Sequence, residues 1–296
     1  MPDLIKEMSH VAVRVPDMQA ATAWATGVLG LRETARADGT VYLTHGVCHH
    51  SLQLIKSDRT ALDHVAMEAH DGDALTHLIG RLRERGVDIL AEEPLELGIA
   101  RAVRFRGPEG HLFEVFVGME EAGPIHTGRG VQPRRFGHPN LTCSDVRSTQ
   151  SFLQDVLGFR LSDEIGDSTL AFLRCNPEHH GIGLQQGATG LNHYAWEVEG
   201  LPELGRLGDV LSRNDGRFIW GPGRHGAGDH VFTYHFDPSG CVVEYYADMR
   251  QIWDDDTYVP GNWSLEDHRG QNLWGPVTPT ELLEASIPLA DTDAAK

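Results

Sequence analysis

Near its C-terminal end the chain concentrates side chains that can bind a metal ion or carry a proton. The segment GRHGAGDHVFTYHFDPSGCVVEYY, residues 223–246, contains three histidines, three tyrosines and one glutamate. Its composition predicts two short strands, with DPSG as the turn between them. A metal site is rarely built from one hairpin, so we expect further ligands from other parts of the chain.

The chain contains an internal repeat with a period near 130 residues. SHVAVRVPDMQAATAWATGVLGL (9–31) matches GHPNLTCSDVRSTQSFLQDVLGF (137–159), and VRFRGPEGHLFEVF (103–116) matches TYHFDPSGCVVEYY (233–246). The offsets of these two pairs are 128 and 130 residues, so the register drifts very little along the repeat. The sequence therefore predicts a duplicated domain.

Each half has the same internal rhythm. An alternating strand leads to Asp17, which is a good helix N-cap, and a helix follows that ends at Gly30. Short strands come next, and the pattern then restarts with another strand and helix. We predict an α+β fold of four βαβββ modules in two tandem domains, each a curved mixed sheet that encloses a cavity, with the helices outside.

The repeat divides the chain into three predicted parts. Residues 1–125 form an N-terminal non-catalytic repeat domain, and residues 126–250 form a C-terminal catalytic metal-binding domain. Residues 251–296 have no counterpart in the first half and carry three tryptophans, so we interpret them as a tail that acts as a lid over the active site or as an oligomer contact. We expect the last dozen residues to be disordered.

Both halves place a histidine on the first strand, a histidine on the strand of the second module and a glutamate on the last strand. These residues are His10, His64 and Glu114 in the first half, and His138, His193 and Glu244 in the second. Side chains alternate across a strand, so inward residues of three strands in a curved sheet can converge. Two imidazoles and one carboxylate suit a non-haem Fe(II) or Mn(II) and leave coordination positions open.

The two halves differ in the residues that could carry protons. His225 stands nineteen residues before Glu244, and Tyr234 stands ten residues before it. The same offsets from Glu114 fall on a leucine and on Arg104. We therefore predict that the second half alone is catalytic. His179 is expected to be exposed.

The hairpin closely resembles the signature of the extradiol ring-cleaving dioxygenases, of the catechol 2,3-dioxygenase type, in the vicinal oxygen chelate or glyoxalase superfamily. The matching residues are GRH, then seven residues, then TY, HF, DPSG and CVVE. This family usually has an aliphatic residue before the tyrosine, where this chain has Thr233. The resemblance covers about residues 5–250, and the tail resembles that of members that cleave carboxylated or otherwise substituted catechols.

The resemblance implies a substituted catechol as the substrate, bound with dioxygen at Fe(II) or Mn(II) and cleaved beside its hydroxyls, in the degradation of aromatic compounds. It implies that the metal ligands are His138, His193 and Glu244. His180 would lie near dioxygen and donate a proton. Tyr234 would hydrogen-bond a substrate oxygen, and His225 would position the other side of the substrate. His235 should point to the opposite face of its strand, and His230 is left undecided.

Composition excludes several other kinds of protein. A net charge of −18 argues against a nucleic-acid partner, because phosphate binding depends on clustered lysine and arginine. No stretch has the roughly 20 apolar residues that span a bilayer, and the N-terminus lacks the features of a signal peptide. We expect a cytoplasmic protein with no membrane partner, and the resemblance implies a homo-oligomer.

Two other functions fit the same scaffold. A glyoxalase-like metal-dependent isomerase or epimerase would use a ligand set richer in carboxylates and would lack the pair formed by His225 and Tyr234. A non-enzymatic binding protein of the kind that sequesters antibiotics would need no metal triad.

Overall fold

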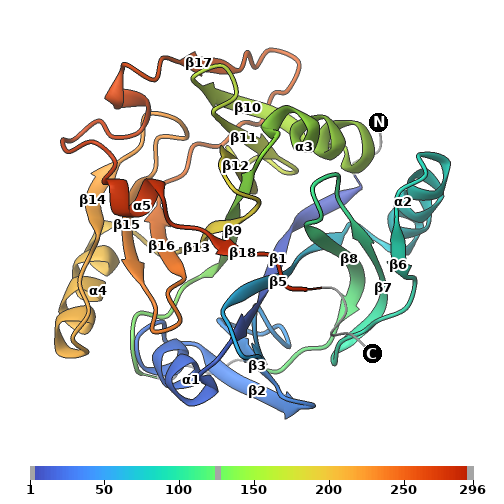
Figure 1. Cartoon of the computed structure of the whole chain (residues 1–296), viewed down its shortest axis with the longest axis horizontal. Helices are drawn as coiled ribbons and strands as arrows, with labels where there is room; N and C mark the ends of the chain where they lie inside the picture. Colours follow the sequence, from blue (N-terminus) through green and yellow to red (C-terminus); the bar gives the residue numbers. More distant parts are fainter. Residues whose placement is uncertain (1–3, 124–127, 292–296) are drawn as a thin grey trace.

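The computed structural model describes residues 4–123 and 128–291 and contains two large mixed sheets (Figure 1). Each sheet is built from one half of the chain, and each half runs twice through a strand, a helix and three strands. The prediction of four βαβββ modules in two tandem domains is confirmed. No helix in the described part of the chain is both long enough and apolar enough to cross a membrane.

The first sheet has eight strands in the order β2-β3-β4-β1-β5-β8-β7-β6. Its helices are α1 (Met18–Gly27) and α2 (Gly72–Glu84). Its strands are β1 (Ile5–Val15), β2 (Arg32–Ala37), β3 (Thr40–Thr44), β4 (Leu52–Lys56), β5 (Ala61–Ala69), β6 (Ile89–Ala91), β7 (Ile99–Arg106) and β8 (Leu112–Met119).

The second sheet repeats this order and adds strands from the tail. Its main path runs β14-β15-β16-β13-β9-β12-β11-β10-β17. Its helices are α3 (Val146–Phe152), which continues into the π-helical turn η1 (Leu153–Leu157), and α4 (Leu201–Arg213). Its strands are β9 (Arg135–Cys143), β10 (Arg160–Ile165), β11 (Leu170–Arg174), β12 (Ile182–Gln186), β13 (Gly190–Glu197), β14 (Trp220–Arg224), β15 (Val231–Phe236) and β16 (Val242–Ala247).

The helices begin and pack as their sequences predict. The Asp17 side chain accepts a hydrogen bond from the Ala20 N–H at 3.0 Å, which caps the first turn of α1. On α4, Leu204, Leu207 and Leu211 recur at helical spacing and are all buried. Figure 1 shows α4 on the outside of the molecule, where it contacts β15 and β16. The helices therefore cover the outer face of each sheet and leave the inner face for a cavity.

The tail (residues 251–291 of the described chain) is ordered and joins both domains. Its elements are β17 (Gly261–Trp263), the 3-10 turn η2 (His268–Gly270), α5 (Thr280–Leu283) and β18 (Ile287–Pro288). Strand β18 pairs antiparallel with β13, and Leu289 forms a bridge with Leu62 on β5 of the first domain. The expectation that the last dozen residues are disordered is wrong for 285–291, because strand pairing holds them; the final five residues lie outside the described chain.

Candidate metal centre

His138, His193 and Glu244 come together in the second domain. The Nε2 atom of His138 lies 3.0 Å from Oε2 of Glu244, and Nε2 of His193 lies 3.2 Å from the same oxygen. The three candidate ligand atoms lie within 4.8 Å of one another, and all three residues are buried. The structure thus brings together the three residues that the sequence predicted as metal ligands.

Strand register explains why these side chains meet. β9, β13, β16 and β15 are consecutive neighbours in the sheet, and they carry His138, His193, Glu244 and Tyr234. Tyr234 is paired directly with Glu244, so both side chains stand on the same face of the sheet. Each ligand therefore comes from a different strand, which accounts for their wide separation in the sequence.

The charge of Glu244 is stabilised by its histidine neighbours. Burial alone would raise the pKa of this carboxyl, but the neighbouring imidazoles of His138, His193 and His230 hold it well below its usual range. Burial also lowers the pKa of His138 to about 4, so its imidazole is neutral at pH 7. A neutral imidazole beside an ionised carboxylate is the protonation state that a divalent cation requires of its ligands.

Three buried atoms of this group have no hydrogen-bond partner: Nδ1 of His138, Nε2 of His193 and Oε1 of Glu244. An unpartnered buried acceptor costs free energy unless another group compensates for it. A metal ion bound between the two imidazoles and the carboxylate would provide that compensation. The group is compatible with a 2-His-1-carboxylate metal site.

A hydrogen-bond chain orients His193 from behind. Its Nδ1 atom lies 2.6 Å from Oδ1 of Asn192, so Nδ1 carries the proton and Nε2 keeps its lone pair. The Asn192 amide nitrogen donates to the carbonyl oxygens of Leu282 at 2.9 Å and Ala285 at 2.7 Å. These two donations fix which end of the amide faces His193.

His225 and Tyr234 form a hydrogen-bonded pair beside Glu244. His225 Nε2 lies 3.0 Å from the Tyr234 hydroxyl, and His225 Nδ1 contacts the backbone oxygen of Gln271. Burial holds the pKa of His225 well below its usual range, so its neutral ring donates to Gln271 and accepts from the phenol. Burial and the neighbouring Glu244 raise the pKa of Tyr234 well above its usual range, so the phenol keeps its proton.

His180 lies on the other side of His138. The ring centres of the two residues are 4.3 Å apart, and Nδ1 of His180 lies 3.0 Å from Nδ1 of His179. Burial, with the charge of the neighbouring histidines, lowers the pKa of His180 well below its usual range. His179 is fully buried, so the expectation that it is exposed is wrong; its Nε2 lies 3.3 Å from Asp163.

His230 is the histidine that the sequence left undecided, and it lies inside the site. Its Nε2 is 3.4 Å from Oε1 of Glu244, and its ring centre is 4.6 Å from that of His225. It precedes β15, in a loop whose direction strand alternation does not predict. His235 packs outside the pocket between Trp24 and Tyr245, so its predicted direction is confirmed.

One pocket is lined by the candidate ligands and their polar neighbours. It has about 570 Å³ of space not filled by protein atoms, a figure that includes its opening to solvent. The lining residues at its floor are His138, His180, His193, His225, His230, Tyr234 and Glu244. The tail contributes five lining residues: Gly270, Gln271, Thr278, Leu282 and Leu283.

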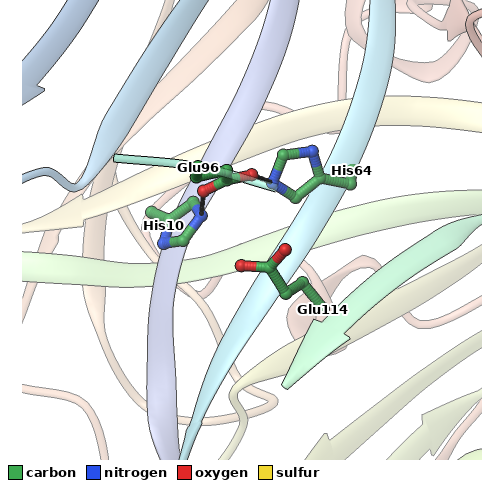
Figure 2. Close-up of side chains that lie close together, drawn as sticks. All are labelled: His10, His64, Glu96 and Glu114. Carbon is green, nitrogen blue, oxygen red and sulfur yellow. Dashed lines mark ion pairs between the residues drawn. The ribbon is translucent and has the colours of Figure 1, made fainter. Parts of the chain in front are cut away.

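The first domain holds a similar cluster with an additional carboxylate. Figure 2 shows the Glu96 carboxylate between the imidazoles of His10 and His64, with Glu114 beside them. Nε2 of His10 lies 3.1 Å from Glu96, and Nε2 of His64 lies 2.6 Å from it. Glu96 is on the loop between β6 and β7, outside the repeated ligand positions, so comparison of the halves did not find it.

Arg104 gives this first cluster a positive charge of its own. Its Nη2 donates to Glu114 at 2.7 Å and also contacts Glu96, so one guanidinium bridges the two carboxylates. Burial lowers the pKa of His64, but Glu96 and Asp63 outweigh that effect and raise it to about 9. The two carboxylates are therefore neutralised by an arginine and a protonated histidine. In the second domain the position of Arg104 is taken by the uncharged Tyr234.

The sequence profile of the glyoxalase/bleomycin resistance protein/dioxygenase superfamily matches residues 7–115 and 135–245. The chain therefore belongs to this superfamily. Each matched segment corresponds to one of the two domains.

Among individual relatives, the chain is 26% identical over 298 residues to the manganese-dependent 2,3-dihydroxybiphenyl 1,2-dioxygenase of Geobacillus genomosp. 3, covering 92% of this chain and 94% of that protein. It is 25% identical over 300 residues to an iron-dependent extradiol dioxygenase of Rhodococcus jostii (strain RHA1), covering 92% and 96%.

Solved structures agree over almost the whole chain. The Mn(II)-bound glyoxalase from Novosphingobium aromaticivorans superposes with a TM-score of 0.89 at 27% identity and covers 99% of both chains. Homoprotocatechuate 2,3-dioxygenase from Arthrobacter globiformis superposes with a TM-score of 0.89 at 26% identity, covering 98% of this chain and 94% of that one.

The arginine in the first cluster makes Glu114 a stability residue. We expect Glu114→Ala to lower the free energy of unfolding by about 3 kcal/mol, because it leaves the buried Arg104 with one carboxylate fewer. Urea denaturation measures this change. Activity per folded molecule and metal content should stay unchanged.

A matched control is Glu68→Ala, which removes a glutamate that pairs with Lys6 at the surface. That change should cost less than about 1 kcal/mol. If Glu114→Ala were as stable as the control, Arg104 would not depend on Glu114 for its charge balance.

Proposed function

We propose that the chain is an extradiol dioxygenase that cleaves a substituted catechol beside its hydroxyls with O₂, at a centre formed by His138, His193 and Glu244. Fe(II) or Mn(II) fits this centre, and the two relatives named above include one of each metal dependence. The observation that carries the proposal is the convergence of two imidazole nitrogens and one carboxylate within 4.8 Å on the pocket floor, beside a tyrosine–histidine pair.

A 2-His-1-carboxylate centre holds its metal through one face and leaves positions open for other ligands. When bound, the metal would supply a redox-active centre at which a catechol and dioxygen meet. The pocket above the three candidate ligands gives both reactants a common site.

Tyr234 and His225 can handle the protons of the catechol. The neutral His225 ring has an acceptor at Nε2, which holds the Tyr234 phenol and can accept a hydrogen bond from a substrate hydroxyl when the phenol turns to the substrate. The Tyr234 phenol keeps its proton at neutral pH and can donate a hydrogen bond to the resulting oxyanion. The Gln271 carbonyl holds the opposite side of the His225 ring, which keeps its acceptor directed toward Tyr234.

His180 is proposed as the proton donor on the dioxygen side. It is buried in the pocket wall next to His138 and has the aromatic ring of Phe172 at 5.0 Å between ring centres. This wall excludes water around the imidazole, so negative charge that develops beside it is stabilised by few groups other than His180.

A glyoxalase-like isomerase is the second candidate, favoured by the likeness to the Mn(II)-bound glyoxalase. The pocket distinguishes the two candidates in part. Its ligand group contains one carboxylate, and it carries the His225 and Tyr234 pair, which an isomerase does not need. Ring cleavage of a catechol in air separates the two activities.

Assembly and location are parts of the same proposal. The exposed tryptophans Trp253 and Trp274 in the tail support a contact between copies of the chain. The tail's contribution to the pocket lining supports its proposed role as a lid. We also propose a cytoplasmic location, which agrees with four unpaired cysteines.

Anaerobic reconstitution with Fe(II) or Mn(II), followed by catechols in air, tests the function. We expect one metal per chain and a yellow ring-fission product. Glu244→Ala should abolish both, because it removes the only carboxylate of the group. Stoichiometric metal without cleavage of any catechol would favour the isomerase.

Tyr234→Phe separates chemistry from metal binding. We expect turnover to fall about 100-fold or more, because the donor to the substrate oxygen is lost. Metal content should stay at the level of the unchanged protein, since the phenol is not among the candidate ligands. Loss of metal in this variant would contradict the role assigned to Tyr234.

A further inference from the structure

The pocket above the candidate ligands has a mostly apolar wall. Its apolar lining includes Ile165, Leu170, Phe172, Trp220, Leu282 and Leu283. These residues come from β10, β11, β14 and the tail helix α5, so apolar side chains reach the pocket from several elements. A catechol substituent that leaves the metal centre meets this surface.

Polar groups in the rest of the wall are uncharged. Asn140, Gln185, Gln271 and Thr278 can form hydrogen bonds but carry no charge. Within the described ranges 4–123 and 128–291, no lysine or arginine lines the pocket.

Two arginines near the pocket are engaged by other groups. Arg224 donates to the Asp229 backbone oxygen at 2.6 Å, and its guanidinium lies over the Trp274 ring at 5.5 Å. Arg269 forms an ion pair with Asp267 at 2.6 Å. Neither guanidinium is directed at the pocket lining by these contacts, so the wall offers no permanent positive charge to an anionic substituent.

A carboxylate on the substrate would lose its hydration in this wall without gaining a cation. An alkyl or aryl group would gain by removing apolar surface from water. The pocket can therefore discriminate against a charged substituent because it lacks a cation to pair with it, as well as through its apolar contacts with an uncharged one.

On the basis of the proposed function, we propose that the natural substrate class is a catechol with an uncharged, apolar substituent. Carboxylated catechols are disfavoured because the wall that surrounds the substituent lacks a cation. The tail resembles that of enzymes that cleave carboxylated or otherwise substituted catechols. Of these two classes, the proposal keeps only the uncharged substituted catechols.

The test compares ligands of nearly equal size. The metal-loaded protein is titrated anaerobically with 4-ethylcatechol and with 3,4-dihydroxyphenylacetate, so that binding is measured without ring cleavage. The neutral compound should bind at least about 10-fold more tightly. Equal or tighter binding of the carboxylate would overturn the proposal.

Cleavage in air is then measured for the same pair. Failure to cleave either compound would count against the proposed function, whereas the binding ratio tests the substrate class alone. The two failures are thus distinguishable.

Leu283→Arg places a cation in the wall. Leu283 is partly exposed at the end of α5, so the longer side chain can be accommodated without burying its charge. We expect the binding preference to shift toward the carboxylated compound by about 10-fold. Leu283→Gln, which is polar but uncharged, is the control and should leave the preference nearly unchanged.

A separate observation concerns the tail and the candidate ligand His193. One amide, that of Asn192, contacts both: it accepts from Nδ1 of His193 and donates to two carbonyl oxygens of the tail. Asn192 is 4% exposed, so water does not readily replace these partners. In the first domain the matching residue is Asp63, which accepts from His64 at 2.8 Å but has no amide donor.

Given the proposed ligand role of His193, we infer that Asn192 is a positioning residue that couples docking of the tail to the orientation of this ligand. With the tail in place, the amide nitrogen is held by Leu282 and Ala285, and its oxygen must face His193. Release of the tail removes this constraint and lets the amide turn.

Metal affinity, measured by competition with a chelator, tests the coupling. Asn192→Ala should weaken metal binding about 10- to 100-fold. Asn192→Asp keeps the acceptor for His193 and should restore much of the affinity, while its tail becomes more sensitive to protease. Unchanged affinity in Asn192→Ala would overturn the inference.

Ile287→Asp gives the second half of the test. Ile287 is a buried residue of β18 that pairs with Leu191, away from the pocket lining, so a charge there displaces the tail. Ile287→Asp should weaken metal binding when Asn192 is unchanged. In the Asn192→Asp variant it should weaken metal binding little further. Equal effects in both backgrounds would exclude coupling through Asn192, and absence of metal from the unchanged protein would count against the proposed function.

Discussion

The structure depends on the neutralisation of buried carboxylates in the middle of each sheet. Glu114 and Glu244 stand at matching positions, are fully buried and lie close to two or more histidines each. A buried anion needs a compensating positive charge. In the first domain the chain itself supplies that charge through Arg104 and the protonated His64. In the second domain the uncharged Tyr234 stands where the first domain has the arginine, and a metal ion at the proposed centre would supply the compensation. The exchange of Arg104 for Tyr234, together with the additional carboxylate of Glu96 in the first domain, thus distinguishes an internally neutralised cluster from a candidate metal site.

The exchange of Arg104 for Tyr234 between the domains is possible because the sheet fixes the positions of the side chains around it. Four neighbouring strands carry His138, His193, Glu244 and Tyr234 toward one another, and the helices on the outer face leave the inner face free for a pocket. The rigid part of the site is therefore built on strands. The parts that surround a ligand come from the tail and from loops, where sequence can change without disturbing the sheet. This division agrees with a superfamily in which one scaffold serves several activities.

The repeat and the strand alternation were sufficient to predict the modules and the convergence of the triad. Both depend on patterns that recur at fixed intervals, and duplication displays each pattern twice. Glu96, His230 and Asn192 were not identified as members of the clusters. Glu96 and His230 lie on loops, whose path depends on tertiary contacts that no local periodicity records. Asn192 adjoins a candidate ligand, but its role depends on the tail, about 90 residues later in the chain. The order of residues 285–291 was missed for a related reason, because strand pairing with β13 and a bridge to β5 hold them in place.

The position of β18 has a consequence for how the protein matures. This strand follows the other strands of the described chain, and it pairs with β13, which carries a candidate ligand. During synthesis the strands that carry the candidate ligands therefore leave the ribosome before α5 and β18 do. Both sheets can form before the pocket wall contributed by α5 is in place, so the pocket is completed by docking of a later segment onto a scaffold that is already folded.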